Sequence, residues 1–248
     1  MLRHSSLADP PGICVVNWNV NWATAESSRG RVIATKIAAR RPDVVCLTES
    51  HSDFFSSGYV VTADADYGYG DQKTRRKVVL WSSSPWTDVD LGEESELPSG
   101  RFVAATTSTS IDTIRFVGVC IPWRDAHVRG GHRNRRPWED HNRFLEGLPN
   151  TRGSGHEGQL VMLGDFNQTI PRTRAPKQLS ENLTSVLSDF HVATSGDLPG
   201  APGPAIDHVC HSQDLESSMV SILPKKDVDG RRLSDHFGIC VRIDSRAE

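Results

Sequence analysis

The chain has 248 residues, of which 37% are hydrophobic and 24% are charged, and its formal net charge is −3. This length and apolar content are enough to bury a substantial core, and one large domain is the expected organisation. The slightly negative charge argues against a strongly basic nucleic-acid-binding protein, although basic groups can still gather locally.

Cysteine usage and the N-terminal segment indicate the compartment. Cysteines fall in apolar, strand-like stretches without metal-ligand spacing, at positions 14, 46, 120, 210 and 240. An odd, scattered set of this kind predicts reduced core thiols. Residues 1–11 are polar and predict a flexible N-terminus, with no signal peptide there and no membrane-spanning run elsewhere. We therefore expect a cytoplasmic protein that is not bound to a membrane, and favour a monomer.

The predicted elements are mostly strands. Segments that are β-branched or alternating predict strands at 13–19, 43–48, 58–62, 77–82, 102–107, 114–121, 159–163, 206–211, 219–223 and 238–243. Apolar residues at three- and four-residue steps predict helices at 28–40, 137–148 and 175–188. Many strands with few helices predict two stacked sheets flanked by helices.

Polar side chains collect where several of these strands begin or end. They are Asn19, Glu49, Asp165 with Asn167, Asp207, and Asp235 with His236. Clustered oxygen ligands of this kind suit a hard cation such as Mg²⁺ or Mn²⁺. On an extended backbone, Asp165 and Asn167 would share one face and reach the same atom. The alternative is a type I turn, in which Gly-Asp-x-Asn is common.

Asp207 and His236 form a predicted acid–histidine pair. The carboxylate would fix the imidazole tautomer and raise its pKa. A protonated histidine could then stabilise charge that builds on phosphoryl oxygens. The neighbouring His208 alternates to the other side of the strand, so we expect a structural role for it.

Taken in chain order, the motifs resemble those of the endonuclease/exonuclease/phosphatase superfamily, which includes deoxyribonucleases, AP endonucleases, sphingomyelinases and inositol polyphosphate phosphatases. The matching pieces are Trp18-Asn19-Val20, Leu47-Thr48-Glu49, Gly164-Asp165-Phe166-Asn167, Ile206-Asp207-His208 and Ser234-Asp235-His236. The resemblance implies a single domain over 12–244 with a four-layer α/β sandwich fold, two stacked mixed β-sheets flanked by helices. It also implies metal-dependent hydrolysis of phosphate esters, but this fold hosts nucleases and phosphatases alike.

The resemblance further implies roles for individual residues. Glu49, Asn19 and Asp235 would hold Mg²⁺ or Mn²⁺. Asp165 would orient and deprotonate the attacking water, because neutral water is a poor nucleophile, or would assist the leaving group. Asn167 would hold the phosphate or Asp165.

The chain departs from the family pattern at two positions. Asn21 stands where the family often has an aspartate, which removes one possible negative charge near the metal. Cys120 stands where AP endonucleases carry a catalytic tyrosine and deoxyribonucleases a second histidine. Because a thiol donates weakly to phosphate, Arg124, His127 or His132 are the alternatives for that role.

Basic residues follow two of the motifs. Such runs are typical of a solvated surface and equally of a polyanion-binding groove. The predicted substrate-binding residues are Arg124, Asn167, Arg172 and Arg174. Trp123 and Trp138 flank an arginine-rich loop and could stack on bases, although Trp138 at helical spacing is also typical of a core residue.

We therefore expect a metal-dependent hydrolase that cleaves phosphodiester bonds, most readily a nuclease acting on nucleic acid. One alternative is a phosphatase on a small phosphorylated metabolite or inositol phosphate, and another is a catalytically silent binding scaffold. AP-site specificity is not expected, because residues 203–206 before Asp207 lack the aromatic and basic residues of those enzymes. The complete set of motif residues argues against the scaffold, whereas Asn21 and Cys120 favour it.

Overall fold

The computed structural model describes residues 12–70, 73–93, 96–151 and 158–246. The segment predicted to be a flexible N-terminus, residues 1–11, lies outside the described residues. Within the described ranges, every helix is too short or too polar to span a membrane.

Sheet A contains six strands in the order β11-β12-β1-β2-β4-β3. They are β1 (Gly12–Asn19), β2 (Val44–His51), β3 (Tyr59–Thr62), β4 (Arg75–Ser82), β11 (Leu215–Leu223) and β12 (Gly238–Ser245). β1 and β2 pair in parallel, whereas the other neighbours pair antiparallel.

Sheet B also contains six strands, in the order β5-β6-β7-β8-β10-β9. They are β5 (Trp86–Asp90), β6 (Phe102–Ser108), β7 (Thr113–Cys120), β8 (Leu160–Asp165), β9 (Phe190–Val192) and β10 (Asp207–Ser212). β7 and β8 pair in parallel, and the other neighbours pair antiparallel. Both sheets are therefore mixed, as predicted, but the edge strands β5 and β9 were not predicted.

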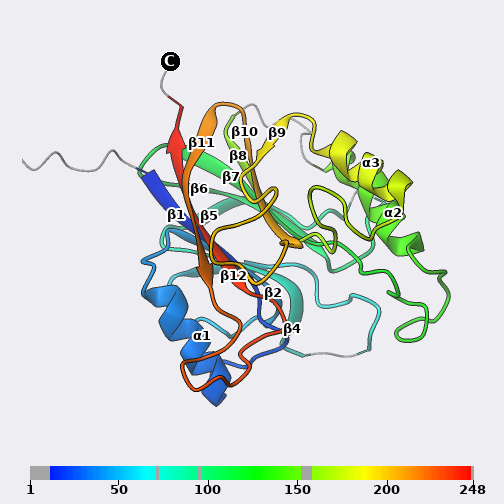
Figure 1. The fold of residues 1–248 in the computed structure, drawn as a ribbon, viewed down its shortest axis with the longest axis horizontal. Coiled ribbons are helices and arrows are strands. Elements are labelled where there is room, and N and C mark those ends of the chain that lie inside the picture. Colours follow the sequence, from blue (N-terminus) through cyan, green and yellow to red (C-terminus); the bar gives the residue numbers. More distant parts are fainter. Residues whose placement is uncertain (1–11, 71–72, 94–95, 152–157, 247–248) are drawn as a thin grey trace, which may run out of the picture.

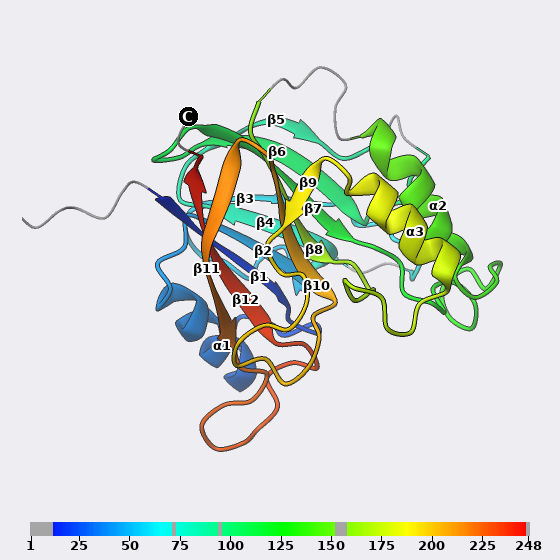
Figure 2. The same ribbon diagram turned by 45° about the horizontal axis from the view of Figure 1, so that its top comes forward.

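Three α-helices cover the outer faces of the two sheets (Figures 1 and 2). α1 (Ser28–Ala38) packs on sheet A, where Ile33 joins a buried cluster with Trp18. α2 (Glu139–Gly147), the short 3₁₀ helix η1 (Leu148–Asn150) and α3 (Lys177–Val186) pack on sheet B, where Phe144 joins Val117. A third cluster fills the space between the sheets. The predicted four-layer α/β sandwich is confirmed.

The helices lie where the apolar spacing predicts them, but each is shorter than its predicted range of 28–40, 137–148 or 175–188. α2 begins after Trp138, because that residue has a left-handed φ of 71° that cannot continue a helix. Trp138 is half-buried and lines a pocket instead of joining the core.

Candidate functional site

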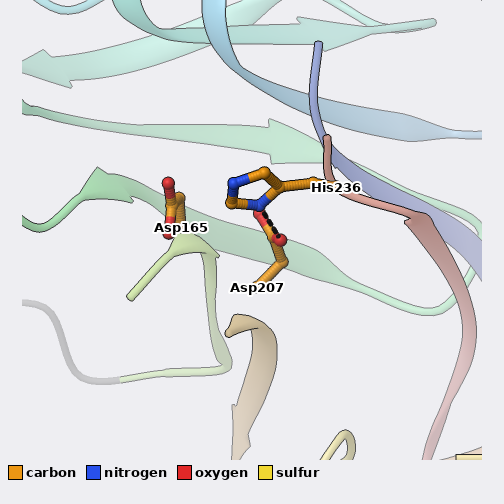
Figure 3. Close-up of side chains that lie close together, drawn as sticks. All are labelled: Asp165, Asp207 and His236. Carbon is orange, nitrogen blue, oxygen red and sulfur yellow. Dashed lines mark hydrogen bonds and ion pairs between the residues drawn. The ribbon is translucent and has the colours of Figure 1, made fainter. Parts of the chain in front are cut away.

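The polar strand ends meet at one edge of the sandwich. Asp165 ends β8, and its register partner Asp207 begins the adjacent antiparallel β10. His236 precedes β12 of the other sheet, and Figure 3 shows its ring beside both carboxylates. The three side chains each place a nitrogen or oxygen atom within 4.8 Å of the others. The sandwich thus brings together three side chains that lie far apart in the sequence.

The Asp207–His236 pair is a short hydrogen bond across the two sheets. His236 Nδ1 lies 2.6 Å from Asp207 Oδ2, and the side chains are 14% and 4% exposed. Burial of the imidazole opposes its protonation, but the charge and hydrogen bond of Asp207 raise the pKa of His236 to about 10. The ring is therefore a cation near neutral pH, with its second nitrogen turned away from Asp207 (Figure 3).

Two hydrogen bonds hold the His236 loop against β1. Trp18 Nε1 donates to the His236 carbonyl oxygen over 3.1 Å. The Ser234 hydroxyl donates to the Asn19 carbonyl oxygen over 2.6 Å, and the same hydroxyl accepts the His236 backbone N–H. The Ser-Asp-His motif therefore fixes the imidazole through its serine as well as through Asp207.

Asp165 is a buried carboxylate with two donors. Its Oδ2 accepts from Asn19 Nδ2 over 3.0 Å, and its Oδ1 accepts from the Asn167 backbone N–H over 3.0 Å. Burial, followed by the charge of Asp207, raises the pKa of Asp165 to about 7. A carboxyl with a pKa near neutral pH is suited to accept a proton from water.

Gly164 and Asn17 set the position of Asp165. Gly164 has a φ of 148°, and a Cβ at this position would lie 1.8 Å from the carbonyl oxygen of Val119 on β7. Only glycine fits so close an approach. Asn17 Nδ2 on β1 donates to the carbonyl oxygens of Gly164 and His208 over 2.9 and 3.1 Å. The end of β8 is thus held by both sheets.

Asn167 does not share a strand face with Asp165, so that prediction is wrong. The chain leaves the strand after Asp165, and Asn167 has a left-handed φ of 53°. Its side chain donates to the Ile121 carbonyl oxygen over 2.9 Å and lines a pocket of about 420 Å³ with Arg174. The alternative of a turn, stabilised by the Asp165 carboxylate, describes this segment better.

The three predicted metal ligands have different surroundings. Asn19 donates its amide to Asp165, and Asp235 accepts from Asn21 Nδ2 over 2.8 Å. Glu49 has a left-handed φ of 48° and places Oε1 at 2.7 Å from Lys77 Nζ. Neither carboxylate, Glu49 or Asp235, belongs to the compact group formed by the two aspartates and His236 within the described ranges.

The residues present nevertheless fit a hard divalent cation. Asp207 Oδ1 is buried and has no hydrogen-bond partner. The charge of Glu49 contributes to the raised pKa of Asp165, so these two carboxylates lie within electrostatic reach. Carboxylate oxygens are the donors that Mg²⁺ and Mn²⁺ prefer.

The predicted substrate-binding arginines differ in position. Arg174 lines the pocket beside Asn167. Arg124 is largely exposed, with Nε 3.6 Å from Asp125 Oδ1, and the exposed Arg172 donates to the Ala175 carbonyl oxygen over 3.2 Å. Arg174 therefore shares a pocket with a motif residue, Asn167.

Most of the residues that could take the role of the family tyrosine or histidine are buried or already contact other groups of the protein. Cys120 is buried between the sheets, and burial raises the pKa of its thiol to about 12, so the thiol is neutral. His127 is buried and lies 2.6 Å from the Asp140 carboxylate through Nδ1, with Nε2 3.1 Å from the Tyr67 carbonyl oxygen. His132 is exposed and packs against the His127 ring.

The structure adds residues that the sequence patterns did not single out. Lys77 faces Glu49, although in the sequence it belongs to a run of basic residues typical of surface charge. Three aromatic residues gather around Lys77, namely Trp22, Tyr67 and Tyr69. The Tyr-Gly-Tyr-Gly segment at 67–70 was the sequence signal that could have pointed to this aromatic group. The residues that pack beside it depend on the fold and could not be read from the sequence.

Known proteins share this fold and sequence pattern. The model of the Endonuclease/Exonuclease/phosphatase family matches residues 16–236. Comparison with curated proteins gave no match. The 3′ phosphatase NExo from Neisseria, solved with a product DNA hairpin, is 20% identical with a TM-score of 0.68, over 94% of this chain and 99% of that one.

Two further solved structures resemble the chain. The human Nocturnin catalytic domain, with a bound sulfate anion, is 17% identical with a TM-score of 0.62, over 95% of this chain and 94% of that one. An endonuclease/exonuclease/phosphatase from Beutenbergia cavernae is 16% identical with a TM-score of 0.64, over 95% and 72%. At these identities the structures show a common fold, and the family match covers most of the sequence. The chain therefore belongs to the Endonuclease/Exonuclease/phosphatase family, whose members are hydrolases acting on ester bonds.

Proposed function

We propose that the protein is a divalent-metal-dependent nuclease that cleaves phosphodiester bonds by attack of water. The observation that carries this proposal is the arrangement of Asp165 beside the hydrogen-bonded Asp207–His236 pair. It combines a carboxyl whose pKa is near neutral pH with a histidine held as a cation. Hydrolysis of a phosphodiester requires both a proton acceptor for water and positive charge at the phosphoryl oxygens.

Each residue has a defined task in this mechanism. Asp165, in its ionised form, accepts the proton of the attacking water, while Asn19 and the Asn167 backbone hold the carboxylate in place. His236, oriented by Asp207, donates a hydrogen bond to a phosphoryl oxygen. A divalent cation held by Glu49 with Asn19 and Asp235 would neutralise charge that develops on the phosphate.

Nucleic acid is the substrate class that we favour. The Neisseria relative in fold was solved with a product DNA hairpin. In this chain, two pockets of about 420 Å³ are lined by basic and aromatic residues: one contains Arg75 and Trp123, and the other contains Arg174 and Trp138. Phosphates and bases of a polynucleotide would find complementary groups there.

Metal-dependent hydrolysis by the purified protein tests the proposal. The panel contains single- and double-stranded DNA, RNA and an inositol polyphosphate, each with Mg²⁺, Mn²⁺ or EDTA, and compares the wild type with Glu49→Gln and His236→Ala. We expect cleavage of a polynucleotide that EDTA and both variants abolish. If only the inositol polyphosphate is hydrolysed, the proposed function changes from nuclease to phosphatase. Absence of all turnover in a folded protein would support the silent scaffold.

A second candidate is removal of a phosphate from a DNA end. It is favoured because the NExo structure is described as a 3′ phosphatase. A 3′-phosphorylated oligonucleotide belongs in the same panel. Release of inorganic phosphate without shortening of the strand would identify this activity.

A further inference from the structure

A pocket beside Glu49 has walls of a distinct composition. It has a volume of about 420 Å³. Aromatic and basic side chains dominate its lining, among them Trp22, Tyr67, Tyr69, Trp123, Arg75 and Arg129. These residues come from the turn after β1, the segment before β4, β4 itself and the loop after β7.

Lys77 connects this pocket to the site. Its Nζ lies 2.7 Å from Glu49 Oε1 and 5.0 Å from the centroid of the Trp22 ring. The same ammonium lies 5.4 Å from the ring of Tyr67 and 6.0 Å from that of Tyr69. In addition, the Trp22 backbone N–H donates to the Glu49 carbonyl oxygen over 2.6 Å. A group bound in the pocket therefore lies next to a predicted metal ligand.

The aromatic rings are held in fixed positions. Trp22 and Tyr67 stack with centroids 5.8 Å apart and an angle of 18° between the rings. The Tyr69 hydroxyl accepts the His127 backbone N–H over 3.1 Å, and its ring packs on the His127 ring. Rings that are already ordered lose little conformational freedom when a planar ligand stacks on them.

Trp123 supplies an open surface on the same pocket. It is 50% exposed, one of the largest exposures of an aromatic side chain in the described residues. Within the described ranges its ring contacts no other aromatic ring and no cation, whereas Trp22 already contacts the guanidinium of Arg75 at 5.0 Å. The Trp123 face is thus available to a ligand.

We propose that this pocket binds an unpaired nucleobase of a polynucleotide and the phosphate beside it. Aromatic faces stack on any base, and Arg75 and Arg129 pair with backbone phosphate. The Asp125 carboxylate, also in the lining, accepts hydrogen bonds from exocyclic amino groups. The inference rests on the proposed nuclease function and narrows its substrate to single-stranded or frayed segments.

A base-paired nucleotide cannot stack on the aromatic residues of the pocket, because neighbouring bases in the duplex cover both faces of its base. An inositol phosphate would meet the two arginines but would leave the aromatic walls without a stacking partner. The combination of rings and guanidinium groups therefore selects a ligand that is both planar and anionic.

Fluorescence anisotropy with two labelled probes tests this inference. One probe is hexathymidylate, and the other is the same sugar–phosphate hexamer without bases. Both are titrated with the protein in EDTA, so binding is measured without turnover. We expect the wild type to bind hexathymidylate about tenfold more tightly than the base-free hexamer.

Substitutions in the pocket test whether it causes the difference in affinity between the two probes. Trp22→Leu and Trp123→Leu should each remove most of the preference for bases, and Trp22→Phe should retain it. Tyr59→Leu on β3, a ring that is 48% exposed and outside the pocket lining, is the matched control and should leave the preference unchanged. Because Trp123 is exposed, its substitution tests the pocket even if Trp22→Leu lowers stability.

Equal binding of the two probes by the wild type, or an equal loss for both in Trp123→Leu, would overturn the subsite. Turnover with Mg²⁺ is measured on the same preparations. Base-dependent binding without hydrolysis of any nucleic acid would support the subsite and refute the nuclease function. Hydrolysis without a preference for bases would refute the subsite and leave the nuclease function standing.

Discussion

The ammonium group of Lys77 lies 2.7 Å from Oε1 of Glu49, and the two side chains are only 9% and 26% exposed. The partners come from the neighbouring strands β4 and β2. Glu49 is also the carboxylate that the family resemblance marks as a metal ligand. A lysine and a divalent cation that share one carboxylate repel each other, so Lys77 should limit how tightly the metal binds.

Replacement of Lys77 should therefore strengthen metal binding. We expect Lys77→Met to raise the affinity for Mn²⁺ about tenfold, because the competing positive charge is removed from a partly buried carboxylate. Isothermal titration calorimetry measures this affinity. Arg76→Met, at the adjacent position on the same strand, is the control. Weaker Mn²⁺ binding in Lys77→Met would mean that Lys77 orients Glu49 and does not compete.

Loss of the His236 imidazole should remove most of the turnover. We expect His236→Ala to lower kcat by about 10²- to 10⁴-fold, since the cation facing the phosphoryl oxygens is lost. The measurement is metal-dependent hydrolysis of the substrate found in the panel. His191→Ala, an exposed histidine on β9, should retain wild-type activity. A His236→Ala enzyme with near-normal kcat would remove this residue from the mechanism.

Stability should depend on pH through Asp165. The pKa of this carboxyl is about 7 in the folded protein and 3.8 in the unfolded chain. Its contribution to stability is therefore complete below 3.8 and is lost as the pH rises through about 7. Asp165→Asn has no such group, so its free energy of unfolding relative to wild type should increase between about pH 4 and about pH 8.

Urea unfolding in EDTA at several pH values measures that difference. Asp197→Asn, which changes an exposed carboxylate, should track the wild type throughout. The titration of His236 is common to all three proteins, so it largely cancels in the comparison. A pH-independent difference between Asp165→Asn and wild type would show that the Asp165 carboxyl ionises normally.

Asn17 should matter for stability, because its amide joins β1 to the other sheet. Asn17→Ala leaves the carbonyl oxygens of Gly164 and His208 without the amide that now bonds both, in a fully buried position. Unsatisfied buried acceptors of this kind cost about 2 kcal/mol. Urea unfolding measures the loss. Asn134→Ala, at an exposed site, should change stability by less than about 0.5 kcal/mol.

The sequence was sufficient to predict ten of the twelve strands in the described ranges and all three α-helices. Strands such as β2 and β8 are buried throughout or nearly so, and their apolar runs are visible in the sequence. β5 has three exposed residues among five, and β9 has only three residues. Such edge strands form because a neighbour is present to pair with, a condition that local sequence does not record.

For the site, the sequence was sufficient to identify several of the residues but not to predict which of them contact one another. The motifs place Asp207 and His236 in order along the chain, and the structure adds the bond between them. A turn at the Asp165 motif was one of two alternatives, but neither the left-handed backbone angle of Asn167 nor the Glu49–Lys77 ion pair was predicted. The first depends on one backbone angle beyond a strand end, and the second on the register of β2 against β4, which pairs Thr48 with Val78 and Ser50 with Arg76.

Three hydrogen-bonded contacts described above cross from one sheet to the other: Asn17 to Gly164, Asn19 to Asp165, and His236 to Asp207. Neither sheet alone contains a proton acceptor together with the histidine and its orienting carboxylate. During refolding, enzymatic activity should therefore return only when the two sheets have docked, later than the formation of either sheet. The rate at which activity recovers after dilution from denaturant would therefore measure the rate of that docking step.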